Sequence, residues 1–358
     1  MRIRPEQLFP ARAGAPTRRP IDVRAPAERE RGAIPGALSL PILDDEERHA
    51  VGVRYAEAGQ AEAIDEGRRW TEADLPRRAS VWRAAAAERP SAFFCWRGGM
   101  RSELAQRLAR HPDTPRVEGG YKALRAHLVE GLGPSLARRE ALVVTGPTGS
   151  GKTELLLAAR RLDGLLALDF EGAAAHRGSA FGATGPQPPQ ATFEHRLMLP
   201  LLLGDQPRLL VEDESRNVGR VHLPGPLHEV VRSAPLLVLE ESLEGRVRRI
   251  HREYALEPAR SQGREATLAT LVAAVQRLRR RLGAAPTERM AAALQDAHAQ
   301  NAWEDVEAFR PVIEPLLRDY YDPLYRKATP TEGRRVAARG HHEELLRWLK
   351  EPTPVSPA

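Results

Sequence analysis

The stretch "ALVVTGPTGSGKTELLLAARR" (residues 141–161) joins a short apolar run to a glycine-rich loop and then to a helical pattern. Within it, "GPTGSGKT" matches the spacing G-x-x-x-x-G-K-[ST], in which glycines let backbone N–H groups turn inward around phosphate oxygens. The helix that follows adds positive potential at its N-terminus. The sequence therefore predicts a strand, a phosphate-binding loop and a helix, which together begin an α/β domain.

Seven residues of this loop are the predicted phosphate ligands. They are Gly146, Thr148, Gly149, Ser150, Gly151, Lys152 and Thr153. Lys152 is expected to bridge phosphate groups and the Thr153 hydroxyl to bind Mg²⁺, which makes Mg²⁺ a candidate cofactor. Only four of the 54 basic residues are lysines, so a lysine at this position indicates that arginine would not serve there. Because the loop contacts phosphates alone, the rest of the ligand stays open.

Two later segments supply further polar side chains for the same site. "VEDES" places Glu212 and Asp213 at the end of a predicted strand, where a carboxylate can approach a metal ion bound to phosphate. "AHRGS" places His176 and Arg177 in a loop after another strand, within reach of anionic oxygens. The alternatives are a structural turn at the histidine and strand-end carboxylates that bind no metal. The identity of any metal stays undetermined.

The chain's one cysteine, Cys95, lies in "SAFFCWRGGMRSELAQRL" (residues 91–108), between a predicted strand and a predicted helix. In a parallel sheet, ligands bind at the carboxyl ends of strands, which is where this cysteine falls. Arg97 and Arg101 would favour its thiolate, and the glycines between them permit backbone N–H groups to point inward. The predicted catalytic residues are therefore Cys95, Arg97 and Arg101. A buried cysteine that acts as a small apolar side chain is the alternative.

Two kinds of chemistry suit such an anion cradle. Residues 95–102, "CWRGGMRS", match C-x-x-x-x-x-R-[ST], the pattern of cysteine phosphatases, and they equally suit a rhodanese-type loop whose cysteine carries a persulfide. Phe94 stands where phosphatases usually have a histidine. The segments "IDVRAPAERERGAIPGALSLP" and "VEGGYKALR" resemble the opening strand and the final strand of rhodanese domains. Sulfur-type chemistry is therefore favoured.

The two loops divide the chain into two predicted α/β domains. Residues 1–133 are expected to form a rhodanese-like, doubly wound parallel sheet, and residues 134–350 a P-loop NTPase-like domain with a helical C-terminal part. Within these domains, residues 28–41 are expected to be a loop and residues 243–281 a long helical region. Residues 351–358 are expected to be a disordered tail.

Composition excludes several classes of protein. Hydrophobic residues make up 42% of the chain and charged residues 28%, which is typical of globular proteins. No run approaches the ~20 apolar residues of a membrane span, and the N-terminus lacks a signal-peptide core. One cysteine cannot form an internal disulfide, so we expect a cytoplasmic protein without membrane contact. A net charge of +6 favours an acidic partner, although a general arginine-rich composition explains the charge equally well.

Eight segments, in order, carry a resemblance over nearly the whole chain. They are "IDVRAPAE", "ERHAVGVRYAEAGQAEAIDEG", "FFCWRGGMRS", "GGYKALR", "TGPTGSGKTELL", "DFEGAAAHRGSAFG", "VEDESRNVG" and "YYDPLY". In these segments the chain resembles the tRNA 2-selenouridine synthase family, which joins a rhodanese-like domain to a P-loop domain. Ala175 stands where the family often has a polar residue, a departure outside the cysteine and phosphate loops.

The resemblance implies a transferase that replaces sulfur by selenium in the wobble 2-thiouridine of tRNA. It implies S-geranylation from geranyl diphosphate followed by exchange with selenophosphate, so these compounds are the expected co-substrates. On this basis the phosphate loop would hold the prenyl diphosphate, and Cys95, Arg97 and Arg101 would bind selenophosphate. tRNA is the expected partner and selenophosphate synthetase a further candidate. The number of subunits is left open.

Two rival functions remain at this point. The first is an ATP-dependent tRNA sulfurtransferase, which would hydrolyse ATP when tRNA is added. The second is a nucleotide-regulated persulfide carrier that binds proteins, which would retain tRNA only weakly.

Overall fold

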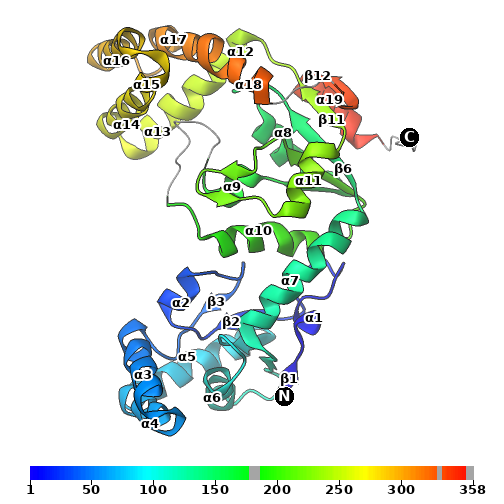
Figure 1. The fold of residues 1–358 in the computed structure, drawn as a ribbon, viewed down its shortest axis with the longest axis vertical. Coiled ribbons are helices and arrows are strands. Elements are labelled where there is room, and N and C mark those ends of the chain that lie inside the picture. The colour runs from blue at the N-terminus through cyan, green and yellow to red at the C-terminus, as the bar shows by residue number, and fades with distance from the viewer. Residues whose placement is uncertain (177–185, 329–332, 352–358) are drawn as a thin grey trace. The chain divides into compact units, whose positions relative to one another are not determined.

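The computed structural model describes residues 1–176, 186–328 and 333–351 (Figure 1). The chain forms two compact units. Unit 1 comprises Met1–Arg138 and Pro188–Asp205, and unit 2 comprises Arg139–Gln187 and Gln206–Ala358. Each unit contains a five-stranded sheet whose paired strands all run parallel. The predicted α/β fold is therefore confirmed, whereas the likeness of unit 1 to rhodanese stays a prediction.

The sheet of unit 1 is built around β4, whose sequence "SAFF" is buried at every position. A strand covered on both faces is expected to be a continuous apolar run, as this one largely is. In their order across the sheet, the strands are β1 (Arg2–Ile3), β5 (Arg116–Val117), β4 (Ser91–Phe94), β2 (Arg19–Asp22) and β3 (Leu38–Ser39).

Part of the segment predicted to be a loop, residues 28–41, is regular structure. Strand β3 lies inside it, and Leu38 of β3 pairs with Ile21 of β2, which adds an edge strand to the sheet. The prediction was wrong there because a strand of two residues is too short to show the alternation by which strands are recognised.

Eight helices accompany this sheet among the described residues of unit 1. They are α1 (Pro5–Leu8), α2 (Pro26–Glu30), α3 (Asp45–Ala58), α4 (Gln60–Thr71), α5 (Leu75–Glu88), α6 (Met100–Ala109), α7 (Gly120–Ala137) and α10 (Gln190–Leu203). Trp82 of α5 and Ala105 of α6 pack with Phe93 of β4 in one apolar cluster. Helix α10 comes from the second half of the chain but packs on α7, where Leu202 lies so close to Gly131 that a Cβ there would be 2.8 Å from it.

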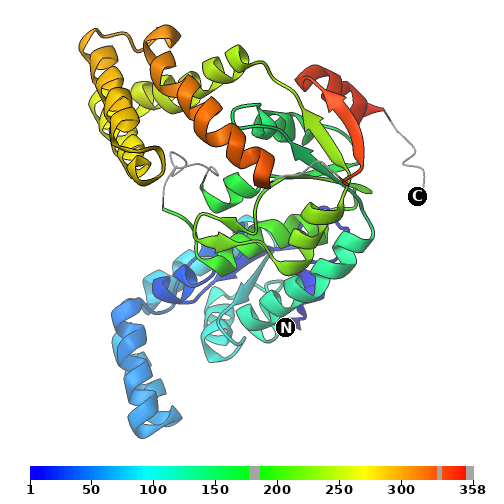
Figure 2. The same cartoon turned by 45° about the horizontal axis from the view of Figure 1, so that its top comes forward.

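The sheet of unit 2 carries the phosphate loop at the end of its central strand. In order across the sheet, the strands are β12 (Val336–Gly340), β11 (Leu236–Leu239), β6 (Glu140–Thr145), β8 (Arg208–Glu212) and β7 (Leu165–Leu168). Figure 2 shows β12, drawn in red, at the edge of this sheet. A separate antiparallel hairpin joins β9 (Asn217–Val218) to β10 (Val221–His222).

The helices of unit 2 form two groups. Those near the sheet are α8 (Lys152–Ala159), α9 (Phe170–Ala174), α11 (Gly225–Ser233) and α19 (His342–Lys350). The others make a helical part: α12 (Leu243–His251), the π-helix η1 (Arg252–Leu256), α13 (Glu257–Gln262), α14 (Arg264–Arg277), α15 (Arg279–Leu282), α16 (Ala284–Ala299), α17 (Val306–Pro315), the π-helix η2 (Leu316–Tyr321) and α18 (Asp322–Ala328).

Each group of helices has its own apolar core. Leu155 of α8 and Leu345 of α19 pack on the sheet, whereas Val275, Leu294 and Leu317 belong to a separate cluster inside the helical part. Figure 1 shows the helices of that part gathered beside the sheet of unit 2. Within the described residues, no helix combines the length and the apolar content that crossing a bilayer requires.

Candidate functional site

The phosphate loop connects β6 to α8, as its spacing predicts, and its glycines are required by its geometry. Gly149 and Gly151 have φ angles of +79° and +95°, in the left-handed region that side-chain-bearing residues rarely occupy. A Cβ on Gly146 would lie 2.7 Å from the carbonyl oxygen of Leu239 in the neighbouring strand. The backbone therefore has no room for side chains at these positions of the loop.

The predicted phosphate ligands lie together at this loop. The Nζ of Lys152 donates a hydrogen bond of 2.9 Å to the carbonyl oxygen of Gly146, so the ammonium group lies over the loop. The Ser150 hydroxyl is buried and has no hydrogen-bond partner among the described residues. A buried hydroxyl of this kind is costly unless it meets an acceptor, and a phosphate oxygen is one. The arrangement suits a diphosphate or triphosphate group.

Helix α12 clamps the outer side of the loop. Arg246 is 5% exposed; its Nε donates to the Thr148 carbonyl oxygen at 2.8 Å, and its guanidinium pairs with Asp322. Arg249 donates to the Gly149 carbonyl oxygen at 2.8 Å. The sequence does not mark these two arginines as contacts of the loop, because the chain holds many arginines and no spacing rule distinguishes these two.

The strand-end carboxylates have separate partners. Glu212 Oε1 accepts hydrogen bonds from the backbone N–H groups of Phe170 and Glu171, at 2.7 and 3.0 Å, and so caps the N-terminus of α9. Asp213 Oδ2 accepts a 2.7 Å bond from the hydroxyl of Thr145, the last residue of β6. Asp213 therefore lies beside the phosphate loop, whereas Glu212 is engaged at α9.

The side chains around the phosphate loop could hold Mg²⁺ only together with the phosphate oxygens of a ligand. The described residues contain no cluster of three or more His, Cys, Asp or Glu side chains that could hold a metal by themselves. Mg²⁺ commonly takes one or two protein oxygens and completes its shell with water and substrate phosphates. Thr153 and Asp213 are the residues that would hold such an ion together with the phosphate oxygens.

Two carboxyl groups near the loop hold protons more tightly than usual. Burial, reinforced by the charge of Glu171, raises the pKa of Glu214 to about 8, although the Lys152 ammonium opposes this rise. Burial also raises the pKa of Glu212 well above its ordinary value, and neighbouring acidic residues add to the effect. Near neutral pH Glu214 is therefore largely uncharged and does not repel a phosphate. Glu214 was not singled out in the sequence because its environment, not its spacing, makes it unusual.

His176 follows α9 and faces inward. Its backbone N–H donates to the Glu171 carbonyl oxygen at 3.0 Å, and its Nδ1 is buried without a partner among the described residues. The predicted site residue Arg177 lies outside the described residues, as do the rest of the "RGSAFG" segment and residues 352–358 of the predicted tail.

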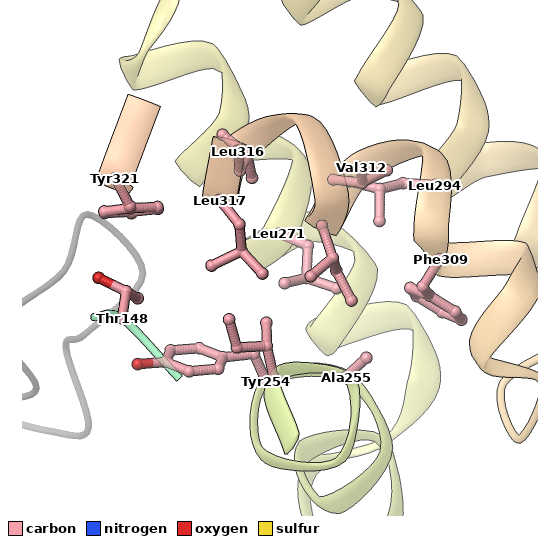
Figure 3. Close-up of a pocket in the computed structure, with 12 residues that line it drawn as sticks. Thr148, Tyr254, Ala255, Leu271, Leu294, Phe309, Val312, Leu316, Leu317 and Tyr321 are labelled. Carbon is pink, nitrogen blue, oxygen red and sulfur yellow. The ribbon is translucent and has the colours of Figure 1, made fainter. Parts of the chain in front are cut away.

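An apolar hollow opens beside the phosphate loop, within the helical part of unit 2 (Figure 3). Its empty volume, counted with the open mouth, is about 570 Å³. The lining residues are Thr148, Ile250, Tyr254, Ala255, Leu271, Leu294, Phe309, Val312, Ile313, Leu316, Leu317 and Tyr321. Apart from the threonine, they are aliphatic or aromatic. A ligand that spans the loop and the hollow would carry phosphate at one end and hydrocarbon at the other.

The cysteine loop lies at the carboxyl end of β4, as predicted, but its thiol is covered. Cys95 is 3% exposed, belongs to the apolar cluster of unit 1, and places its Sγ 3.4 Å from the Ser102 hydroxyl. Arg101 pairs with Glu28, at 2.9 Å between one nitrogen and one carboxylate oxygen, and Arg97 is exposed to solvent. Burial alone would raise the pKa of Glu28, but the Arg101 guanidinium outweighs it and lowers that pKa. An anion that binds Arg101 must therefore compete with Glu28.

Two backbone segments cross closely under this loop. Gly98 and Gly120 both have positive φ angles, +66° and +58°, and a Cβ on Gly120 would collide with the Cys95 carbonyl oxygen and the Gly98 nitrogen. The Tyr121 N–H donates to the same Cys95 carbonyl oxygen at 2.8 Å. The start of α7 thus fixes the position of the cysteine.

Comparison with known proteins points to one family. A family profile described as "tRNA 2-selenouridine synthase AAA domain" matches residues 139–354. A protein named tRNA 2-selenouridine synthase from Cupriavidus pinatubonensis is 39% identical over 349 residues, covering 92% of this chain and 94% of its own. One of the same name from Bordetella bronchiseptica is 38% identical, covering 93% and 94%. A third, from Chromohalobacter salexigens, is 40% identical, covering 92% and 93%.

We predict that Gly120→Ala destabilises the protein by at least about 2 kcal/mol, because it adds both a backbone collision and a strained left-handed alanine. Gly99→Ala is the matched control: its φ is −89°, no atom lies within 4 Å of the added Cβ, and the cost should stay within about 0.5 kcal/mol. Thermal unfolding of both variants measures the difference. Equal melting temperatures would contradict the close crossing.

The raised pKa of Glu214 predicts a pH-dependent stability. Between pH 4.5 and about 8 the folded chain keeps a proton that the unfolded chain has lost, so this group's contribution to the free energy of unfolding falls as pH rises. The slope is up to about 1.4 kcal/mol per pH unit. Glu214→Gln removes the contribution, so its melting temperature relative to wild type should rise from pH 5 to pH 8. The exposed Glu343→Gln should show no such trend; a parallel course for both variants would refute the assignment.

Proposed function

The chain belongs to the tRNA 2-selenouridine synthase family, and we propose that it replaces the sulfur of wobble 2-thiouridine in tRNA by selenium through two successive transfers. It is a transferase that acts on tRNA. In the first transfer geranyl diphosphate alkylates the sulfur, and in the second selenophosphate displaces the alkylated sulfur. The observation that carries the first transfer is the apolar hollow that adjoins the phosphate loop at Thr148.

In the first step the bond between geranyl C1 and the diphosphate oxygen breaks, and the diphosphate leaves with the electron pair. A bond from C1 to the thiouridine sulfur forms, and the uridine loses its N3 proton. Negative charge develops on the departing diphosphate, where Lys152 and the inward backbone N–H groups of the loop would stabilise it. The hollow is lined almost entirely by aliphatic and aromatic side chains, so it offers few hydrogen-bond partners to the base and ribose of ATP and favours a prenyl diphosphate.

In the second step the selenium of selenophosphate attacks C2 of the base. The bond between C2 and sulfur breaks, and geranyl thiolate leaves with the electron pair and takes up a proton. Water then receives the phosphoryl group, which leaves selenium on the base. Alkylation makes this exchange feasible because a thiolate is a far better leaving group than sulfide. Cys95, Arg97 and Arg101 are the residues proposed to bind selenophosphate and to act in this exchange, with the loop moving to uncover the thiol.

The remaining assignments form part of the same proposal. Unit 1 is proposed to be rhodanese-like, Mg²⁺ to accompany the diphosphate, and selenophosphate synthetase to supply the selenium donor. The net charge of +6 supports binding of a tRNA backbone, which would weaken steeply with added salt. A cytoplasmic location agrees with a tRNA substrate.

Lys152→Ala is expected to reduce geranyl transfer to 2-thiouridine tRNA by roughly 100-fold or more, because the developing diphosphate charge loses its cation. The rate is measured by mass analysis of nucleosides after incubation with geranyl diphosphate. Lys350→Ala, on α19, is the matched control and should transfer at the wild-type rate. Undiminished transfer by the Lys152 variant, or tRNA-stimulated ATP hydrolysis by the wild type, would reject the geranyl assignment of the loop.

Cys95→Ala is expected to slow the conversion of geranylated tRNA to selenouridine tRNA by roughly 100-fold or more, because the proposed selenophosphate site loses its thiol, while geranylation itself continues. Geranylated tRNA and selenophosphate are supplied directly, and the seleno-nucleoside is measured. The unchanged first step in the same variant controls for folding. Conversion at the wild-type rate would show that the thiol takes no part.

A further inference from the structure

The apolar hollow beside the phosphate loop carries an inference that rests on the proposed function and extends it to chain-length selection. We propose that the hollow holds the prenyl tail of the diphosphate, and that Phe309 and Leu294 at its far end set the length of tail that the protein accepts. The occupant is thus a short hydrocarbon chain attached to a diphosphate.

The hollow begins where the diphosphate would bind. Thr148 of the phosphate loop lines it, and Arg246 fixes the Thr148 carbonyl oxygen at 2.8 Å. Figure 3 shows Thr148 and Tyr321 at one end of the hollow and Phe309 at the other. A tail whose diphosphate lies in the loop would therefore enter at Thr148 and extend toward Phe309.

The position and the lining of the hollow indicate a ligand site and not a packing defect. Protein interiors are packed so densely that voids larger than a water molecule are few. This one opens at Thr148 of the phosphate loop, and its lining is almost entirely aliphatic and aromatic. It also lies within the apolar cluster of the helical part, where a continuous core would otherwise form.

Both π-helical segments of the described chain contribute to the lining. Tyr254 and Ala255 come from η1, and Leu316, Leu317 and Tyr321 come from η2. π-helical turns are rare because their backbone geometry is less favourable, and where they occur they are frequent at functional sites. Two of them on one cavity are an observation independent of its position and lining, and they point to the same conclusion.

The far end of the hollow is rigid enough to limit the length of a bound prenyl chain. Phe309 is 2% exposed, and its ring centroid lies 5.5 Å from that of Trp303 and 4.9 Å from that of His251. These rings hold the Phe309 side chain in place, so a tail that reaches it must stop. Removal of the ring would free space comparable to one additional isoprene unit.

The first test is binding to the full-length protein. Geranyl diphosphate should raise the melting temperature more than inorganic diphosphate does, because burial of the tail adds to the affinity. Ala255→Phe fills the hollow from η1 and should abolish this extra shift while the shift by inorganic diphosphate remains. Equal shifts by the two ligands in the wild type would overturn the inference.

The second test is chain length. Dimethylallyl, geranyl and farnesyl diphosphates are compared as donors to 2-thiouridine tRNA by their kcat/KM values. Phe309→Ala, and the milder Leu294→Ala, should raise the farnesyl-to-geranyl ratio roughly ten-fold or more. Leu278→Ala is the matched control: Leu278 is buried in the same cluster but does not line the hollow, so its ratio should stay at the wild-type value.

The outcomes separate this inference from the function on which it rests. If the wild type transfers geranyl but neither variant changes the farnesyl-to-geranyl ratio, the hollow does not limit the length of the tail and the inference is wrong. If the wild type neither transfers geranyl nor binds diphosphate, the proposed function itself fails. Because the comparison uses a ratio within one variant, a loss of folded protein affects both donors equally and leaves the test valid.

Discussion

The buried guanidinium of Arg246 joins the two parts of unit 2 on which its chemistry depends. It donates to the Thr148 carbonyl oxygen of the phosphate loop and pairs with the Asp322 carboxylate at the start of α18. A charge this well buried is stable only while both partners remain, since removal of one partner of such a pair typically costs about 3–5 kcal/mol. The phosphate loop and the mouth of the apolar hollow are therefore held in one fixed relation.

In unit 1, backbone contacts hold the cysteine loop in position. Its cysteine loop is fixed by the crossing of Gly98 and Gly120 and by the hydrogen bond from the Tyr121 amide to the Cys95 carbonyl oxygen. Glycine is needed because the two chains approach where a Cβ would stand. The consequence is a rigid support beneath the thiol, while Arg97 lies on the exposed side of the loop.

The sequence predicted the features that depend on local spacing and missed those that depend on tertiary packing. The P-loop pattern, the apolar run of β4 and the position of Cys95 after it are local, and each was found. The hollow was not, because its lining comes from distant elements whose apolar residues look like ordinary core in sequence. The same holds for the packing of α10 on α7 and for the burial of Cys95, which depends on neighbours such as Ser102.

The charge around the phosphate loop depends on how deeply its neighbouring carboxyl groups are buried. A carboxylate beside a phosphate site would repel the ligand, yet Glu214 lies close enough to Lys152 for the two charges to interact. Burial resolves the conflict, since it raises the pKa of Glu214 to about 8 and keeps the group largely protonated at neutral pH. The Lys152 ammonium group then stays available to interact with a bound phosphate. A diphosphate that gains charge as it departs benefits most from that arrangement, because the protonated Glu214 does not compete for the lysine at the moment of bond breaking.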